Sequence, residues 1–311
     1  MLRQMSTGSH EASRRPLYRT LRWGRIAVSL AALAILTFGL TLSAGEIPGA
    51  TRILARVQIL PAVAGFSIVI FVAWLAVTLT FGRLYCSTVC PLGTVQDIAA
   101  RLPRMSRRDS RPYRYSRPLQ PMRYTVLVAV LACLMAGFMT VPSIVDPYTA
   151  WERFCLACLR HIFGEPPLSA AAETASGDAF VPALTIAMSS VAGAVVAIAT
   201  VCIVGALAAR SGRSFCNTFC PVGTTLGIVS RYAIFQMDID TDLCTNCRRC
   251  VDACKSSCID IDDHIVDSSR CVVCFDCTDA CRDNAIRYTP GRKQLSIPMM
   301  QQTDDSKLVE S

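Results

Sequence analysis

Residues 244–281 contain eight cysteines in two copies of one spacing, C-x2-C-x2-C-x3-C. Three cysteines two residues apart can surround one iron–sulfur cubane from a single tight loop, and the fourth cysteine can reach a second cluster. This rule predicts two [4Fe–4S] clusters and an electron-transfer function. The expected ligands are Cys244, Cys247, Cys250 and Cys281 for the first cluster, and Cys271, Cys274, Cys277 and Cys254 for the second.

Two features of this region have other interpretations. C-x2-C pairs also bind zinc, but two complete four-cysteine runs are not typical of a zinc ribbon. A ninth cysteine, Cys258, falls where the second copy has Ala285, so we expect it to pack as a small buried hydrophobe beside Ile259. Lys255 and Arg282 replace the proline that commonly follows the fourth cysteine, which changes the local charge and not the ligands.

A second repeat lies earlier in the chain. Residues 85–94 (YCSTVCPLGT) and 215–224 (FCNTFCPVGT) agree at six of ten positions, and Arg83 or Arg213 precedes each. We call these segments the CxxxCP elements, and their cysteines are Cys86, Cys90, Cys216 and Cys220. One pair of thiols does not complete a cluster, whereas two elements brought together supply four. We expect them to bind a cofactor, a third cluster or a flavin, or to act as a dithiol, unless they only pack at a helix junction.

The elements that must position these cysteines are mainly apolar helices. The chain has 311 residues, 52% of them hydrophobic, and its mean hydropathy is positive, which is typical of a membrane protein. Four stretches without charge reach the length of about 20 residues that a transmembrane helix needs. They are 26–45, 57–82, 124–145 and 179–209. Each CxxxCP element follows the second or the fourth stretch, and its proline is suited to begin a new helix.

Arginines are distributed unevenly between the loops. Six lie in residues 1–25 and nine in residues 83–123, whereas loops 46–56 and 146–178 contain two each. The positive-inside rule therefore places both termini in the cytoplasm. The net charge of +8 is then explained by contact with anionic lipid, and we expect no nucleic-acid binding. The pair Arg14-Arg15 resembles an export signal, but no convincing cleavage site follows, which favours a membrane anchor.

Cys155 and Cys158 form another C-x2-C pair in loop 146–178. On the expected outer side of the membrane a disulfide is the ordinary interpretation, and a redox or metal role is the alternative. Leu159 stands where a c-type haem would need a histidine, so that cofactor is excluded. The three histidines all lie outside the four apolar stretches, which also excludes a transmembrane haem bound by histidine pairs.

Four spans, two CxxxCP elements and an eight-cysteine tail resemble the membrane iron–sulfur proteins of the NapH and MauN type. The membrane parts of NosR and of CcoG/RdxA proteins are similar. The resemblance extends from residue 20 to about residue 290, and we expect neither the flavin-binding domain of NosR nor the long extension of CcoG. It implies electron transfer between the quinone pool and a redox partner, often as a component of a quinol dehydrogenase.

We therefore expect an α-helical polytopic membrane domain followed by a small α+β bacterial-type dicluster ferredoxin domain. The expected divisions are a basic cytoplasmic N-terminus (1–25), a four-span membrane domain (26–235), the ferredoxin domain (238–290) and a disordered tail (291–311). The expected location is the bacterial inner membrane, with quinone as substrate and a cytochrome or ferredoxin-type subunit as redox partner. The alternative, which Cys155 and Cys158 favour, is a membrane reductase that supplies electrons for maturation of a metalloenzyme.

The sequence identifies no catalytic residue. Quinol oxidation releases two protons, and acids near the outer ends of the spans are candidates to accept them. These acids are Glu46, Asp146 and Glu152. For each, solvation in a loop is the more ordinary interpretation.

Overall fold

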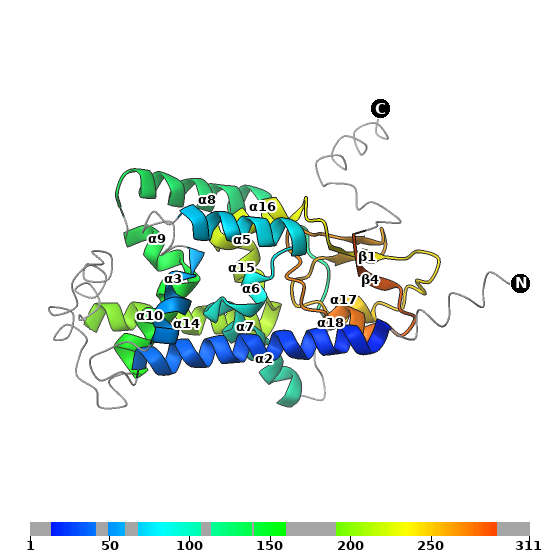
Figure 1. Cartoon of the computed structure of the whole chain (residues 1–311), viewed down its shortest axis with the longest axis horizontal. Helices are drawn as coiled ribbons and strands as arrows, with labels where there is room; N and C mark the ends of the chain where they lie inside the picture. The colour runs from blue at the N-terminus through cyan, green and yellow to red at the C-terminus, as the bar shows by residue number, and fades with distance from the viewer. Residues whose placement is uncertain are drawn as a thin grey trace, which may run out of the picture.

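The computed structural model describes residues 14–41, 49–59, 68–106, 113–138, 140–159 and 191–290. A long helical region ends, on one side, in a small unit of helices and short strands (Figure 1). The expectations for residues 1–13, Glu46 and residues 291–311 lie outside the described residues.

The helical region consists of two groups of helices with the CxxxCP elements between them (Figure 1). Its elements are α2 (Arg14–Thr41), α3 (Gly49–Arg56), α5 (Ile68–Phe81), α6 (Tyr85–Thr88), α7 (Pro91–Ser106), α8 (Gln120–Met135), α9 (Thr140–Val145), α10 (Pro147–Phe154), the π-helix η1 (Cys155–Leu159), α14 (Val191–Ser211), α15 (Ser214–Thr218) and α16 (Pro221–Ser230). Helices α2, α7, α10 and α14 pack together, and α16 packs against both α5 and α8.

Each CxxxCP element is a short helix followed by a longer one. Helices α6 and α15 contain the first cysteine of each element, and α7 and α16 begin at Pro91 and Pro221. Proline suits the first helical position because its φ is already helical and its missing N–H is not needed there. The prediction that these prolines begin new helices is confirmed.

Each apolar stretch of the sequence contains at least one helix. Among the described residues, Pro16–Thr41 and Ala194–Ser211 are long and apolar enough to cross a membrane, while α5 and α8 are apolar but shorter. Helix α8 ends at Met135 in a Schellman motif, because Gly137 has a φ of 78° and Phe138 N donates to Cys133 O. The uninterrupted helix expected over 124–145 is thus divided into α8 and α9, and the four-span arrangement stays a prediction.

The C-terminal unit has two halves of like design. Strand β1 (Gln236–Ile239) pairs antiparallel with β4 (Ile286–Thr289), and β2 (Ile259–Asp260) pairs with β3 (Ile265–Val266). Helices α17 (Arg249–Ala253) and α18 (Asp276–Ala280) pack against each other, and each separates the third cysteine of its copy from the fourth by about one turn. Met237, Ile239 and Ile286 form its core together with several cysteines.

Candidate metal centres

The eight cysteines of the C-terminal unit line two cavities. The first is lined by Cys244, Cys247, Cys250 and Cys281, and the second by Cys254, Cys271, Cys274 and Cys277. Three thiols in each set come from one loop and the fourth comes from the other copy. The structure therefore brings together the two sets that the crossing rule predicts, and the ligation itself stays a prediction.

The cysteine loops have unusual backbone conformations that favour an anionic ligand. In each copy the residues on both sides of the second cysteine are left-handed. They are Asn246 (φ 52°) and Arg248 (φ 58°) in one copy, and Val273 (φ 50°) and Phe275 (φ 61°) in the other. This conformation is especially costly for a β-branched residue such as Val273. Alternating conformations of this kind form backbone nests that are common at Fe–S sites.

The arrangement of the thiols fits a cluster better than a single ion. Within the described part of the chain, no three His, Cys, Asp or Glu side chains are gathered closely enough to hold one metal ion. The thiols surround a cavity instead, and four thiolates around a cavity are the donor set of a [4Fe–4S] cluster. The residues present therefore fit the cofactor that their spacing predicts.

The four CxxxCP cysteines lie together in the helical region. Cys86, Cys90, Cys216 and Cys220 are 2 to 4% exposed, and they are close enough to interact electrostatically. Leu92, Val222 and Leu226 surround them with an apolar shell. Cys220 is the N-cap of α16, where its sulfur accepts a hydrogen bond from Gly223 N at 3.3 Å. Four buried thiols beside a helix N-terminus and two arginines are suited to a cluster or another electron-accepting group.

The two CxxxCP elements contact each other reciprocally through their arginines. Arg83 Nη2 donates to Cys216 O at 3.4 Å, and Arg213 Nη1 donates to Cys86 O at 2.6 Å. Both arginines are fully buried. The arginine of each element therefore bonds to the backbone of the other element, which explains why an arginine precedes both copies.

The glycines of the repeat are required by close approach of the backbone. A Cβ atom on Gly93 would lie 2.4 Å from Cys86 O, and one on Gly223 would lie 2.3 Å from Cys216 O. No side chain fits at these distances without backbone movement. The glycine shared by the two elements therefore keeps each pair of cysteines beside the start of its following helix.

Lys255, which follows Cys254, attaches the cysteine-rich unit to the CxxxCP elements. Its backbone oxygen accepts a hydrogen bond from Arg213 N at 2.8 Å. Its ammonium group is 3% exposed and lies 3.1 Å from an Asp97 carboxylate oxygen and 2.9 Å from one of Asp276. Gly212, with a φ of +66°, permits this contact, because a Cβ atom there would lie 2.2 Å from Lys255 O.

Asp97 in α7 is the centre of a buried ion network. Arg213 Nε lies 2.7 Å and Arg25 Nη1 lies 3.2 Å from its carboxylate, in addition to Lys255. Burial alone would raise the pKa of Asp97, but Arg213, Lys255 and Arg25 hold it well below its usual range. The network thus links α2, α7, α15 and the cysteine-rich unit through charges that have little access to water.

The second cavity lies next to the CxxxCP cysteines. Val272 lines this cavity and also belongs to the apolar cluster that contains Cys86, Cys90 and Cys220. Cys274, from the second set of four, packs against the same cluster. In the first cavity Cys247 is exposed to solvent. The three groups of cysteines are therefore arranged in order, from the buried CxxxCP group through the second cavity to the first.

A cluster of buried polar residues lies near the CxxxCP cysteines. Asp146 is 1% exposed and caps α10 by accepting hydrogen bonds from Tyr148 N (3.1 Å) and Thr149 N (2.9 Å). Burial raises the pKa of Asp146 to about 6 and that of Glu152 to about 7, and the charge of Asp146 adds to the second shift. Tyr85, the neighbour of Cys86, interacts electrostatically with Asp146. The expectation that Asp146 is solvated in a loop is wrong, because its side chain is buried. Glu152 was expected to be solvated as well, and it is only partly exposed.

Two expectations for other cysteines need correction. Cys155 and Cys158 both have free thiols and lie three positions apart in the π-helix η1, so the expected disulfide is not formed. Cys258 is buried as expected, at 2% exposure, but its Sγ atom also lies 3.4 Å from Cys254 Sγ. Cys258 therefore lines the second cavity as a fifth cysteine.

Sequence reasoning missed the residues that join the two regions. Lys255 was recognised only as a departure from the usual proline, and Asp97 and Asp276 were not singled out. The replacement of proline by a lysine was a usable signal, because a charged residue beside a cluster ligand needs a partner.

Comparison with known proteins adds information about both halves of the helical region. The model of a family described as a 4Fe-4S binding domain matches residues 63–108 and 191–239. Each matched segment contains one CxxxCP element, and both end before Cys244. The family match therefore falls on the CxxxCP elements and not on the eight-cysteine unit.

Two curated proteins are similar to parts of the chain. YccM of Escherichia coli K12, named as a candidate electron transport protein, is 25% identical over 199 residues, which are 63% of this chain and 48% of YccM. An uncharacterized protein of Methanocaldococcus jannaschii is 42% identical over 40 residues, 13% of this chain and 16% of that protein. The match thus spans about half the length of YccM, and no solved structure matches the chain. The match to a 4Fe-4S binding domain in both halves of the helical region supports an iron–sulfur cofactor in this chain.

Proposed function

We propose that the chain is a membrane-bound iron–sulfur protein that relays electrons from quinol to a redox partner. The exposure of its apolar helices supports a membrane location. Only 17% of the apolar window of α14 and 39% of that of α2 is buried within the protein. On α8, Val128 is 63% and Met135 is 89% exposed. Apolar surface of this extent is typical of contact with lipid, and a core helix would be covered.

The position of the cysteine-rich unit supports the proposed orientation. Helix α2 begins beside that unit (Figure 1), and Arg22 pairs with Asp276 at 2.7 Å. The arginine-rich ends of the helical region and the two cavities are therefore on the same side. By the positive-inside rule, this side faces the cytoplasm.

The order of the cysteine groups is the observation that carries the proposal. Bound [4Fe–4S] clusters supply one-electron carriers, and the chain places their binding cavities in a row. Val272 and Cys274 bring the second cavity against the CxxxCP cysteines, and exposed Cys247 places the first cavity at the surface. This order suits entry of electrons from the membrane and exit to a soluble domain of the partner.

Asp146 and Glu152 are suited to accept the protons that quinol oxidation releases. Oxidation of a quinol to a quinone releases two electrons and two protons. Asp146 and Glu152, with pKa values raised to about 6 and about 7 by burial, would each accept one proton from a hydroxyl group near neutral pH. Tyr85 interacts electrostatically with both Asp146 and the CxxxCP cysteines Cys86 and Cys90, so proton and electron acceptors would be neighbours.

The CxxxCP cysteines are proposed to hold a third cluster. Four buried thiols and the family match to a 4Fe-4S binding domain both favour a third cluster over a flavin. Cys86, Cys90, Cys216 and Cys220 would be its ligands. Arg83, with Nη2 at 3.8 Å from Cys86 Sγ, would offset part of its negative charge.

Anaerobic purification with measurement of iron and acid-labile sulfide tests the cofactor content. About twelve of each per chain are expected for three clusters, about eight would leave the CxxxCP cysteines to a flavin or to packing, and values near zero would refute the proposal. The electron route is tested by mixing the protein with a reduced quinone analogue. Cys86→Ser and Cys220→Ser should abolish reduction of the clusters in the cysteine-rich unit, whereas Cys202→Ser, at an exposed site in α14, should not.

The alternative, a reductase for maturation of a metalloenzyme, would use Cys155 and Cys158 as a dithiol. Cys155 is 0% exposed and packs against Trp151 and Leu40. Dithiol exchange requires access to both sulfurs, so this burial favours the quinol relay.

A further inference from the structure

We infer that Cys258 sets the reduction potential of the second cluster by donating a hydrogen bond to the ligand sulfur of Cys254. This inference rests on the proposed binding of a cluster in the second cavity. It assigns a function to a cysteine that lies outside both sets of predicted ligands.

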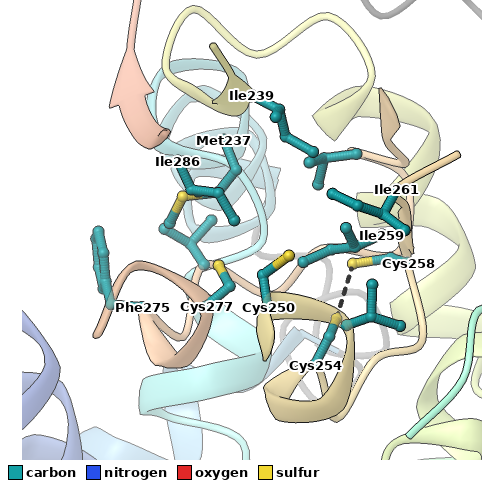
Figure 2. Close-up of a cluster of buried hydrophobic side chains, with 13 residues drawn as sticks. Met237, Ile239, Cys250, Cys254, Cys258, Ile259, Ile261, Phe275, Cys277 and Ile286 are labelled. Carbon is teal, nitrogen blue, oxygen red and sulfur yellow. Dashed lines mark hydrogen bonds between the residues drawn. The ribbon is translucent and has the colours of Figure 1, made fainter. Parts of the chain in front are cut away.

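Geometry gives the first step of the argument. Cys258 Sγ lies 3.4 Å from Cys254 Sγ, and the close-up of the core shows the two thiols directed toward each other (Figure 2). Cys258 is 2% exposed and is packed among apolar side chains that include Ile259 and Val266. Apolar surroundings favour a neutral thiol over a thiolate.

Cluster binding determines the direction of the hydrogen bond. Cys254 must be a thiolate to bind iron, and a thiolate has no proton to donate. The S–H group of Cys258 is then the donor and Cys254 Sγ the acceptor. A hydrogen bond to a ligand sulfur withdraws negative charge and stabilises the reduced cluster, which makes the reduction potential more positive.

The first cavity provides a natural control within the chain. Ala285 occupies the equivalent position, four residues after Cys281, and is also 2% exposed and lines its cavity. Even the backbone contacts correspond, since Ala285 O accepts from Asp240 N at 2.7 Å and Cys258 O accepts from Asp267 N at 2.8 Å. Alanine has no donor. The two halves thus differ at this position by one thiol, which would separate the potentials of two otherwise similar clusters.

An experiment with three variants tests this inference. Cys258→Ala, Cys258→Ser and Ala285→Cys would be purified anaerobically, with iron content measured and each cluster potential determined by redox titration followed by electron paramagnetic resonance. Cys258→Ala should shift one potential to a more negative value and leave the iron content unchanged. Cys258→Ser, which keeps a donor, should restore most of the shift, and Ala285→Cys should shift the other potential to a more positive value.

Two results would overturn the inference. Unchanged potentials in Cys258→Ala, at full iron content, would show that the thiol only fills space. Loss of about four irons in this variant would make Cys258 a ligand and not a donor. A wild-type protein without clusters in the cysteine-rich unit would instead refute the proposed function, and the iron content of the wild type distinguishes this case.

Discussion

Replacement of Lys255 by methionine should loosen the attachment of the cysteine-rich unit to the helical region. The side-chain volume is nearly kept, but the carboxylates of Asp97 and Asp276 lose a buried cation at 3.1 and 2.9 Å. Removal of one partner from a buried ion pair costs about 3–5 kcal/mol. The lower limit applies here, since Asp97 keeps Arg213 and Arg25 and Asp276 keeps Arg22. A loss of about 3 kcal/mol increases the equilibrium constant for detachment of the cysteine-rich unit from the helical region roughly 150-fold.

Hydrogen exchange measured by mass spectrometry can detect this change. The amide of Arg213 donates to Lys255 O at 2.8 Å, so it becomes exposed when the interface opens. Its exchange should be accelerated about 150-fold in Lys255→Met, because exchange of a protected amide follows the opening equilibrium. Arg282→Met is the matched control, since Arg282 has the same place in the other copy but is exposed. Equal exchange of Arg213 in wild type and both variants would refute an attachment through these ion pairs.

Three further predictions concern protons, backbone and ligands. The rate of quinol-dependent reduction should rise with pH and level off about one pH unit above the Glu152 pKa of about 7, because Asp146 and Glu152 accept protons only when ionised. Stopped-flow measurements of Asp146→Asn should show a weaker pH dependence. Gly212→Ala should lower the free energy of unfolding by about 1–3 kcal/mol, because residue 212 has a φ of +66° and its new Cβ atom would press on Lys255 O. Gly205→Ala is the control: a Cβ atom there meets open space, so this variant should raise the thermal unfolding midpoint. Cys247→Ala should remove about four irons per chain and leave the other centres loaded, as measured by iron analysis.

The cysteine sets could be predicted from the sequence because cluster binding depends on local spacing. Loops with two residues between cysteines leave few other ways to surround a cavity, and the structure has the same two sets of four around its cavities. The CxxxCP elements were recognisable as a repeat, but their reciprocal contacts were not. The bonds from Arg83 to Cys216 O and from Arg213 to Cys86 O join residues more than 120 positions apart, which no local pattern specifies.

Helix limits and buried charges were less predictable, for different reasons. The apolar stretch 124–145 contains no charge to mark a boundary, yet one glycine at a φ of 78° ends α8 within it. Asp146 looked like a loop acid because it directly follows the apolar stretch 124–145 and precedes a proline. Its burial results from packing of α10 against α7 and α14, which lie far from it in the chain.

The replacement of proline after the fourth cysteine has different consequences in the two copies. Arg282, next to a ligand of the first cavity, is exposed to solvent, whereas Lys255, next to a ligand of the second, is 3% exposed and pairs with two carboxylates. Proline could not serve at position 255, because it has no cation to place between Asp97 and Asp276. A lysine there is costly unless the cysteine-rich unit remains against α7. The departure from the usual pattern therefore indicates which of the two cavities faces the CxxxCP cysteines, and with it the order in which the three groups of cysteines follow one another.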